Sequence, residues 1–227
     1  MIRRPVAKTS WFTVLLVLAA IVLWVVDQKQ AIGKSPKPAA QKIEKPARET
    51  AKAAGAYEVY HHCTLVEARN NDGDSFLLRL PDGRKAEFRL YFVDTPESAF
   101  KRYAGGDTNH ERIRQQAAEL GGITPEQAVE IGRKGKAFTR GLLGSGSFTI
   151  FTRWDSPFRD KRYHAFVQVQ EAGRPRWLHE LLVERGLARI KTKGADLPDG
   201  TPAARQKEKL RELEKAAKRI GAGVWSL

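Results

Sequence analysis

This chain of 227 residues has few of the cysteine and histidine side chains that disulfide-stabilised and zinc-binding proteins use. It has a single cysteine, Cys63, which excludes an intrachain disulfide. Its five histidines are scattered, so a zinc site is not expected. Acidic residues are scarce relative to basic ones, 26 against 40, and the net charge of +14 favours a polyanionic partner.

The excess of positive charge is divided unevenly along the chain. Residues 1–56 contain ten lysines and arginines against three acidic residues, a net charge of +7. The remaining 171 residues carry the other +7, with thirty basic side chains against twenty-three acidic ones. The part of the chain that can form a folded domain is therefore only moderately basic.

One long hydrophobic run is present, WFTVLLVLAAIVLWVV at residues 11–26, and it follows a basic stretch that contains Arg3, Arg4 and Lys8. Sixteen residues of helix span about 24 Å, less than the ~30 Å hydrocarbon core, which suits a signal peptide. No small-x-small cleavage site follows, and Trp24 resembles an interfacial anchor. Residues 1–32 are thus predicted to be an uncleaved signal-anchor or a signal peptide, with the domain exported in both cases.

Residues 33–56 contain three prolines, no aromatic residue and a single isoleucine. This composition cannot bury enough apolar area to offset the entropy of ordering, so a disordered linker is predicted here. The folded domain is predicted to occupy residues 57–227.

A β-hairpin is predicted near the start of this domain. Apolar runs at Phe76–Leu80 and Phe88–Val93 flank the sequence Pro-Asp-Gly-Arg at 81–84, and Pro-Asp-Gly between apolar runs predicts a turn.

Four acidic residues lie at the open end of this hairpin, with Asp72 and Asp74 before the first strand and Asp94 and Glu97 after the second. Clustered carboxylates repel one another unless a cation or a proton joins them, and hard divalent cations prefer oxygen ligands. An EF-hand is excluded, because Phe76 occupies the fifth position where a ligand is required. The alternative interpretation is that these short acidic motifs only form turns.

The rest of the chain predicts an α+β domain in which a five-stranded barrel is packed with about three helices. In residues 98–122 a short helical run at 110–120 lies within a segment that is either a lid or recognition loop beside the site, or an ordinary surface excursion. The remaining expected elements are strands at 57–66, 148–152 and 163–170, and helices at 125–143, 177–186 and 202–220.

The motifs DGDS, FRLYFVDTPES, RYHAFV and VWSL follow one another in an order that resembles the micrococcal (thermonuclease) nuclease family. The resemblance covers roughly residues 59–227, and the segment after Glu97 is longer than in the family. It implies an OB-fold nuclease that uses one calcium ion to hydrolyse DNA or RNA phosphodiesters, here as a monomer acting as an endonuclease.

The resemblance also implies roles for individual residues, matched motif by motif. The calcium ligands would be Asp74, Asp94 and the backbone carbonyl of Thr95, with Asp72 acting through water. The catalytic residues would be Glu97 as general base and Arg89 and Arg162 as the phosphate-binding arginines. Lys161 and Arg159 are neighbouring candidates for the second arginine.

The chain departs from the family where bases would stack, and the second strand of its predicted hairpin must be interrupted. Lys191, Thr192 and Lys193 stand where the family has tyrosines that stack on the base, so contacts to the nucleic-acid backbone are expected to replace stacking. Arg89 and Asp94 are five positions apart, so a regular strand would direct them to opposite faces and must bend or end between them. The competing function is an inactive nuclease-like module that binds nucleic acid or protein at the membrane surface.

Overall fold

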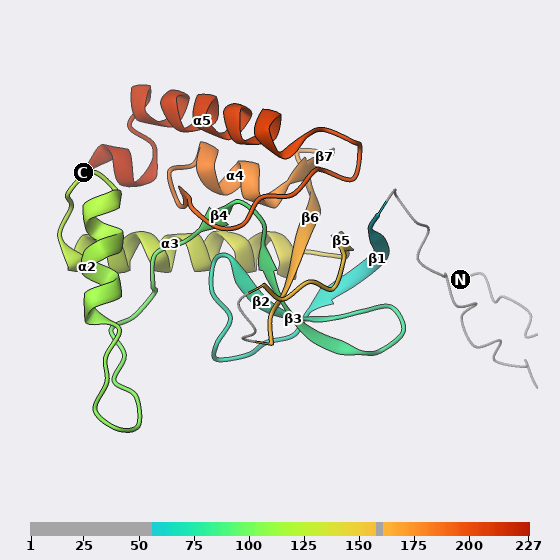
Figure 1. Cartoon of the computed structure of the whole chain (residues 1–227), viewed down its shortest axis with the longest axis horizontal. Coiled ribbons are helices and arrows are strands. Elements are labelled where there is room, and N and C mark those ends of the chain that lie inside the picture. Colours follow the sequence, from blue (N-terminus) through green and yellow to red (C-terminus); the bar gives the residue numbers. More distant parts are fainter. Residues whose placement is uncertain (1–55, 158–160) are drawn as a thin grey trace, which may run out of the picture. The chain divides into compact units, whose positions relative to one another are not determined.

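The folded part of the chain is built around a closed β-barrel (Figure 1). The computed structural model describes residues 56–157 and 161–227. The predicted N-terminal hydrophobic segment at 11–26 and the predicted linker at 33–56, except for its last residue, lie outside the described residues. Within the described part of the chain, no helix is both long and apolar enough to cross a membrane.

Five strands close the barrel. They are β1 (Glu58–Leu65), β2 (Ser75–Arg79), β3 (Lys85–Leu90), β5 (Phe148–Thr152) and β6 (Tyr163–Glu171). Neighbours pair in the order β3-β2-β1-β5-β6, and a parallel pairing between β3 and β6 joins the two ends. The expected α+β OB-fold with a five-stranded barrel is thus confirmed.

Strands β7 (Arg174–Trp177) and β8 (Arg189–Ile190) were not predicted. Strand β7 extends the sheet beside β6, so the helix predicted from residue 177 begins one residue later, as α4 (Leu178–Glu184). Strand β8 pairs with β4 (Val93–Asp94) in a separate two-stranded sheet. Strand β8 has only two residues and the four residues of β7, Arg-Pro-Arg-Trp, contain no apolar run, so neither strand carries a recognisable hydrophobic period.

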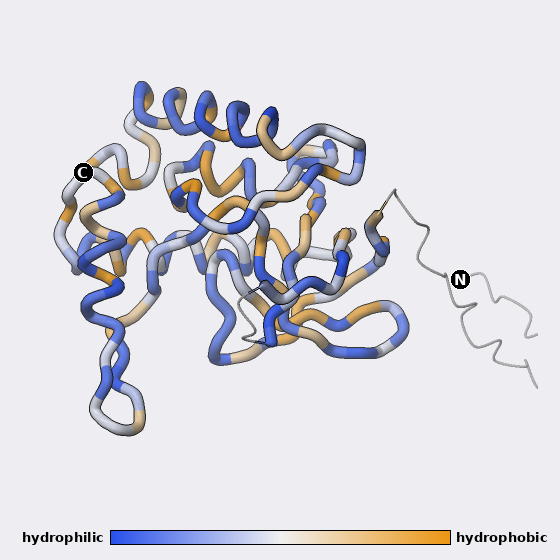
Figure 2. The backbone as a smooth tube through the Cα atoms, in the orientation of Figure 1, coloured by the Kyte–Doolittle hydropathy of each residue, from blue (hydrophilic) through white to orange (hydrophobic). Residues whose placement is uncertain are grey.

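In the described part of the chain, four α-helices accompany the barrel (Figure 1). Helix α3 (Pro125–Gly144) starts at a capping box formed by Thr124 and Gln127, as its sequence predicted, and α3 and α4 contact the barrel strands. Helix α5 (Ala203–Arg219) packs chiefly on α4 and is largely hydrophilic along its length (Figure 2). A short 3-10 helix, η1 (Gly223–Ser226), ends the chain.

Helix α2 (His110–Glu119) is the short helical run of the long segment that follows Glu97. It packs on α3, and the loop that precedes it projects away from the barrel (Figure 1). Ile113 and Ala117 of α2 form a small apolar cluster with Ala128 and Val129 of α3. The segment is therefore fastened to the domain by its helix.

Candidate active site

The hairpin of β2 and β3 brings Asp74 and Arg89 together. Ser75 pairs with Arg89 across the two strands, and Asp74 directly precedes Ser75. The Nη2 atom of Arg89 lies 3.3 Å from Oδ2 of Asp74, and both side chains are buried. This is the end of the hairpin at which the sequence placed the acidic cluster.

The chain breaks its strand geometry between Arg89 and Asp94. Strand β3 ends at Leu90, Phe92 adopts a positive φ of 70°, and β4 begins at Val93. This break turns Asp94 back towards Arg89, whose Nη2 atom lies 2.6 Å from Oδ1 of Asp94. The expected interruption of the strand is confirmed.

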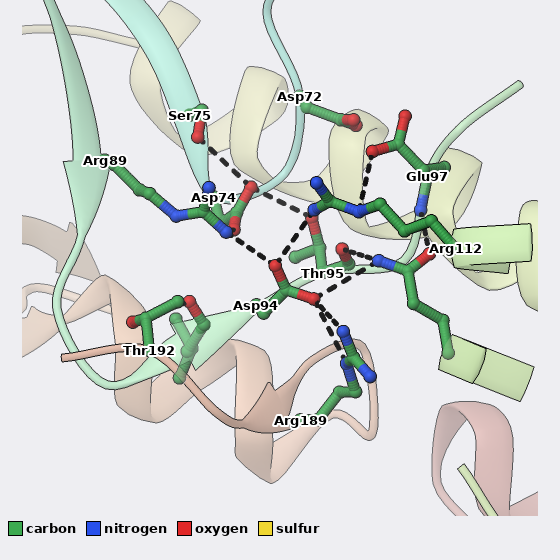
Figure 3. A network of polar contacts seen from close by, with 12 residues as sticks. Asp72, Asp74, Ser75, Arg89, Asp94, Thr95, Glu97, Arg112, Arg189 and Thr192 are labelled. Atoms are coloured by element: carbon green, nitrogen blue, oxygen red, sulfur yellow. Dashed lines mark hydrogen bonds and ion pairs between the residues drawn. The ribbon is translucent and has the colours of Figure 1, made fainter. Parts of the chain in front are cut away.

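Asp94 is the centre of the polar network in Figure 3. Its Oδ1 atom accepts hydrogen bonds from Arg89 and from Nη2 of Arg112 at 3.3 Å. Its Oδ2 atom accepts from Gln116 at 3.2 Å and from Arg189, whose Nε atom lies 3.1 Å away. Burial raises the pKa of Asp94, but Arg189, Arg112 and Arg89 outweigh burial and hold the pKa below its ordinary value.

Asp74 is less completely satisfied. Its Oδ1 atom accepts weak hydrogen bonds from the hydroxyls of Ser75 at 3.4 Å and Thr95 at 3.3 Å. Its Oδ2 atom is buried and accepts no hydrogen bond, although the Arg89 guanidinium lies nearby. Burial raises the pKa of Asp74 to about 6 despite the opposing effect of Arg89.

Asp72 lies at the edge of the network in Figure 3, where no dashed line joins it to the other residues drawn. Its Oδ1 atom accepts a hydrogen bond from the backbone of Gly73 at 3.1 Å. Burial, followed by repulsion from Asp74 and Glu97, raises the pKa of Asp72 to about 7. Asp72 and Asp74 thus form an acidic pair that resists full ionisation without a cation.

Glu97 is held by the segment that follows it. Its Oε2 atom lies 3.2 Å from Nζ of Lys101 and accepts from Asn109 at 3.3 Å, and its Oε1 atom lies 3.3 Å from Nε of Arg112. The backbone N–H of Glu97 donates to Oε1 of Gln116 at 3.0 Å. The inserted segment therefore fixes both the backbone and the carboxylate of Glu97.

Arg162 reaches the same cluster from the start of β6. The parallel pairing of β3 with β6 places Phe88 beside Tyr163, so Arg162 enters next to the strand that carries Arg89. Its Nη1 atom donates to Oγ of Ser75 at 3.2 Å. Of the alternatives to Arg162, Arg159 lies outside the described residues and the Lys161 side chain is exposed.

The structure therefore brings together the seven residues singled out from the sequence, namely Asp72, Asp74, Arg89, Asp94, Thr95, Glu97 and Arg162. Thr95 participates through its hydroxyl, and its carbonyl accepts from Gln116 at 3.4 Å. In residues 56–157 and 161–227, no group of three or more histidine, cysteine, aspartate or glutamate side chains is arranged to hold a metal ion.

Three further residues of the network were not predicted: Arg112 and Gln116 of α2, and Arg189 of β8. Arg112 and Gln116 are four positions apart, so they share one face of the helix, but nothing in the sequence says which way that face points. Arg189 also forms an ion pair with Glu119, which ties β8 to α2. A lone arginine after an apolar helix gives no signal of such a role.

The three residues that replace the family's stacking tyrosines are all engaged elsewhere. Lys191 pairs with Glu119, and Lys193 pairs with Asp155. The Thr192 hydroxyl lies 3.2 Å from the backbone carbonyl oxygens of both Leu90 and Val93 and shares its one hydrogen between them. This loop therefore supports the broken strand and provides no aromatic surface for a base.

A search of curated proteins finds no match. The family model described as "Staphylococcal nuclease homologue" matches residues 87–227, which is more than half of the chain and includes Arg89, Asp94, Glu97 and Arg162. Asp72 and Asp74 precede the matched span, but the hairpin places them against it. The barrel, the site and this match together show that the chain belongs to the staphylococcal nuclease homologue family.

Proposed function

We propose that this protein is a calcium-dependent nuclease that hydrolyses internal phosphodiester bonds of DNA or RNA by attack of water. The observation that carries the proposal is the convergence, from separate segments, of the side chains that this reaction needs. Asp74 precedes β2, Arg89 is the penultimate residue of β3, Asp94 and Glu97 lie beyond the break at Phe92, and Arg162 precedes β6. Membership of the family supports the same assignment.

Glu97 is the general base in this proposal. It takes a proton from water as the water oxygen bonds to phosphorus and the bond from phosphorus to the leaving oxygen breaks, and the leaving alkoxide takes up a proton from solvent. A base must be held within reach of the attacking water. The contacts of Glu97 with Lys101, Asn109 and Arg112 restrain its carboxylate in this way.

Arg89 and Arg162 bind the non-bridging phosphate oxygens. A guanidinium group presents its N–H donors in a planar fork, and two such groups stabilise the charge-rich transition state more than the ground state. Arg89 is buried between Asp74 and Asp94, which fixes its orientation before the substrate arrives. Arg162 is only partly buried and can adjust to the substrate.

The carboxylates fit a calcium ion in donor type and in charge. Oδ2 of Asp74 is a buried oxygen without a hydrogen bond, and the raised pKa values of Asp72 and Asp74 reflect burial and repulsion that a hard cation would relieve. Asp74, Asp94 and the Thr95 carbonyl would hold the ion, with Asp72 acting through water. When bound, calcium would neutralise charge on the phosphate.

The proposal is tested by incubating the full-length protein with circular single-stranded DNA or with RNA, in calcium or in a calcium chelator. Linearisation of the circles only in calcium is the expected result, since a circle has no ends for an exonuclease. Arg89→Lys keeps the charge but loses the fork, and it should slow cleavage by about two orders of magnitude. The control is Arg84→Lys, in the exposed turn of the same hairpin.

A second candidate function is a nuclease-like barrel that binds nucleic acid without cutting it. Both oxygens of Asp94 already hold strong donors, which favours this alternative because calcium would compete with three arginines. Binding of single-stranded DNA with no cleavage in calcium, and no change in affinity when calcium is removed, would establish the inactive module and contradict the nuclease.

A further inference from the structure

An open groove of about 890 Å³ runs beside the site, between the chain that follows Glu97 and helix α3. Ser98 and Ala99 line one side of it. Arg133, Lys136 and Arg140 of α3 line the other. We call this feature the α3 groove.

The three basic residues of the α3 groove form a row along the helix. They are spaced by three and four positions, so they share one face of α3. With a rise of 1.5 Å per residue, the row from Arg133 to Arg140 is about 10 Å long. A row of this kind can follow a chain of negative charges.

The α3 groove adjoins the acidic end of the site. Lys136 and Arg140 also line a small neighbouring cavity of about 50 Å³ whose wall includes Asp72. Ser98, on the opposite wall, is the residue that directly follows Glu97.

The existing partners of these basic side chains are easily replaced. Arg133 lies 3.5 Å from Glu130, and Arg140 lies 2.9 Å from Glu67, with all four side chains more than half exposed. Exposed ion pairs of this kind contribute little to stability, so phosphate oxygens can take the place of the glutamates.

The remaining lining residues are small. Ala137, Gly141, Gly144 and Ser145 line the α3 groove, and no aromatic side chain does; the exception in size and charge is Glu67, the exposed ion-pair partner of Arg140. The groove therefore offers cations for a phosphate backbone but no ring on which a base could stack, so the expected binding does not depend on sequence.

We propose that the α3 groove binds the sugar-phosphate backbone of the nucleic-acid strand on one side of the scissile phosphate. This inference rests on the proposed function, since it extends the substrate of the same site. Arg133, Lys136 and Arg140 hold flanking phosphates, and Glu97 and Asp72 mark the end of the groove where the scissile phosphate lies.

The test compares two triple variants of the full-length protein. One replaces Arg133, Lys136 and Arg140 with glutamine. The control variant replaces Arg211, Lys215 and Arg219 with glutamine. These three basic residues are exposed in a similar row on α5, so the control removes the same charge elsewhere. The substrates are a single strand of about 20 nucleotides, longer than the roughly 4–16 nucleotides that one OB-fold covers, and a dinucleotide too short to enter the α3 groove.

For the long strand, the groove variant should show a KM about tenfold higher with kcat within about twofold of the parent. The slope of log KM against log salt should fall by about 2, because three phosphate contacts at roughly 0.7 each are lost. The control variant, and cleavage of the dinucleotide by either variant, should match the parent. Equal losses in both variants, or an equal loss with the dinucleotide, would overturn the proposal.

Binding of the fluorescently labelled long strand is measured in parallel, by anisotropy in a calcium chelator, and requires no cleavage. A Kd raised about tenfold in the groove variant alone supports the α3 groove even if the parent proves to be inactive. A parent that cuts DNA while the groove variant binds as tightly as the control refutes the α3 groove and leaves the proposed nuclease intact.

Discussion

Arg112 links Asp94, a proposed calcium ligand, to Glu97, the proposed general base. Its guanidinium lies 3.3 Å from Asp94 on one side and 3.3 Å from Glu97 on the other. About half of the Arg112 side chain is exposed, so its contribution to stability is small. Arg112 is therefore expected to serve mainly to hold the Glu97 carboxylate in position.

Arg112→Gln should lower kcat by about tenfold or more, because the carboxylate of Glu97 loses one of its three restraints. The free energy of unfolding should change by less than about 1 kcal/mol, as is usual for a half-exposed ion pair. Steady-state kinetics and urea denaturation measure the two quantities. Arg114→Gln is the control, since Arg114 lies on the same helix and forms an ion pair with the exposed Glu111.

If the Arg112 and Arg114 variants cleave equally fast, Arg112 has no role in positioning Glu97. Arg112→Lys separates charge from geometry, since lysine keeps the charge but cannot reach both carboxylates with one planar group. It should recover only part of the lost rate.

Asp74→Asn tests the calcium site. The asparagine removes a charged oxygen that now lacks a hydrogen bond, so calcium affinity measured by calorimetry should fall by at least about tenfold. Saturating calcium should raise the melting temperature of the parent but not that of the variant. Asp107→Asn, in the exposed loop before α2, should bind calcium as the parent does. Unchanged affinity in Asp74→Asn would place the calcium elsewhere.

At the scale of elements, the sequence predicted what depends on local patterns. The hairpin turn, the capping box of α3 and the barrel strands each carry their own signal in consecutive residues. The break at Phe92 was also predictable, since Arg89 and Asp94 could not otherwise meet. These predictions succeeded because the physical cause lies within a few residues of its effect.

The elements that the sequence missed depend on partners far along the chain. Strand β8 exists only because Val93 and Asp94 lie beside it, about a hundred residues away in sequence. The direction of Arg112 is set by the packing of Ile113 and Ala117 of α2 on α3, which no local period reveals. The residues that converge at Asp94 could thus be listed in part from the sequence, while Arg112 and Arg189 required the tertiary structure.

The contact between α4 and α5 contains a buried histidine that predicts a pH dependence. Nε2 of His179 lies 2.9 Å from Nε2 of Gln206, an amide that can only donate, so the ring accepts there and is neutral. Burial, with a smaller effect of Lys209, lowers the pKa of His179 to about 3. In the unfolded chain its pKa returns to about 6.5.

Between these values the unfolded chain binds a proton that the folded chain does not. Stability is therefore retained above about pH 6.5 and is lost as the pH falls towards 3, by on the order of a few kcal/mol. His179→Gln keeps an acceptor for Gln206 and should flatten the loss of urea stability between about pH 6.5 and 4. His61→Gln, at an exposed histidine, should leave it unchanged, and equal curves for parent and His179→Gln would contradict the assignment.

At the scale of the whole molecule, the excess positive charge is divided between two parts of the chain. Half of the net charge belongs to residues 1–56, which precede the segment matched by the family model, and half belongs to the rest of the chain. The described domain gathers arginines around its carboxylates and a basic row along α3. The N-terminal charge instead flanks and follows the hydrophobic run at 11–26.

We propose that the hydrophobic run holds the domain outside the cytoplasmic membrane, with the basic N-terminus inside. A calcium-dependent nuclease would be nearly idle at the low free calcium of cytoplasm and active where calcium is plentiful, so export would also spare the cell's own nucleic acids. Fractionation of cells that express the full chain tests this. Full-length protein in the membrane fraction that is degraded by protease added outside supports an anchor, and a shortened soluble protein supports a cleaved signal peptide. Intact protein in the cytosol would refute both, because a basic stretch followed by sixteen uncharged residues would then have failed to direct export.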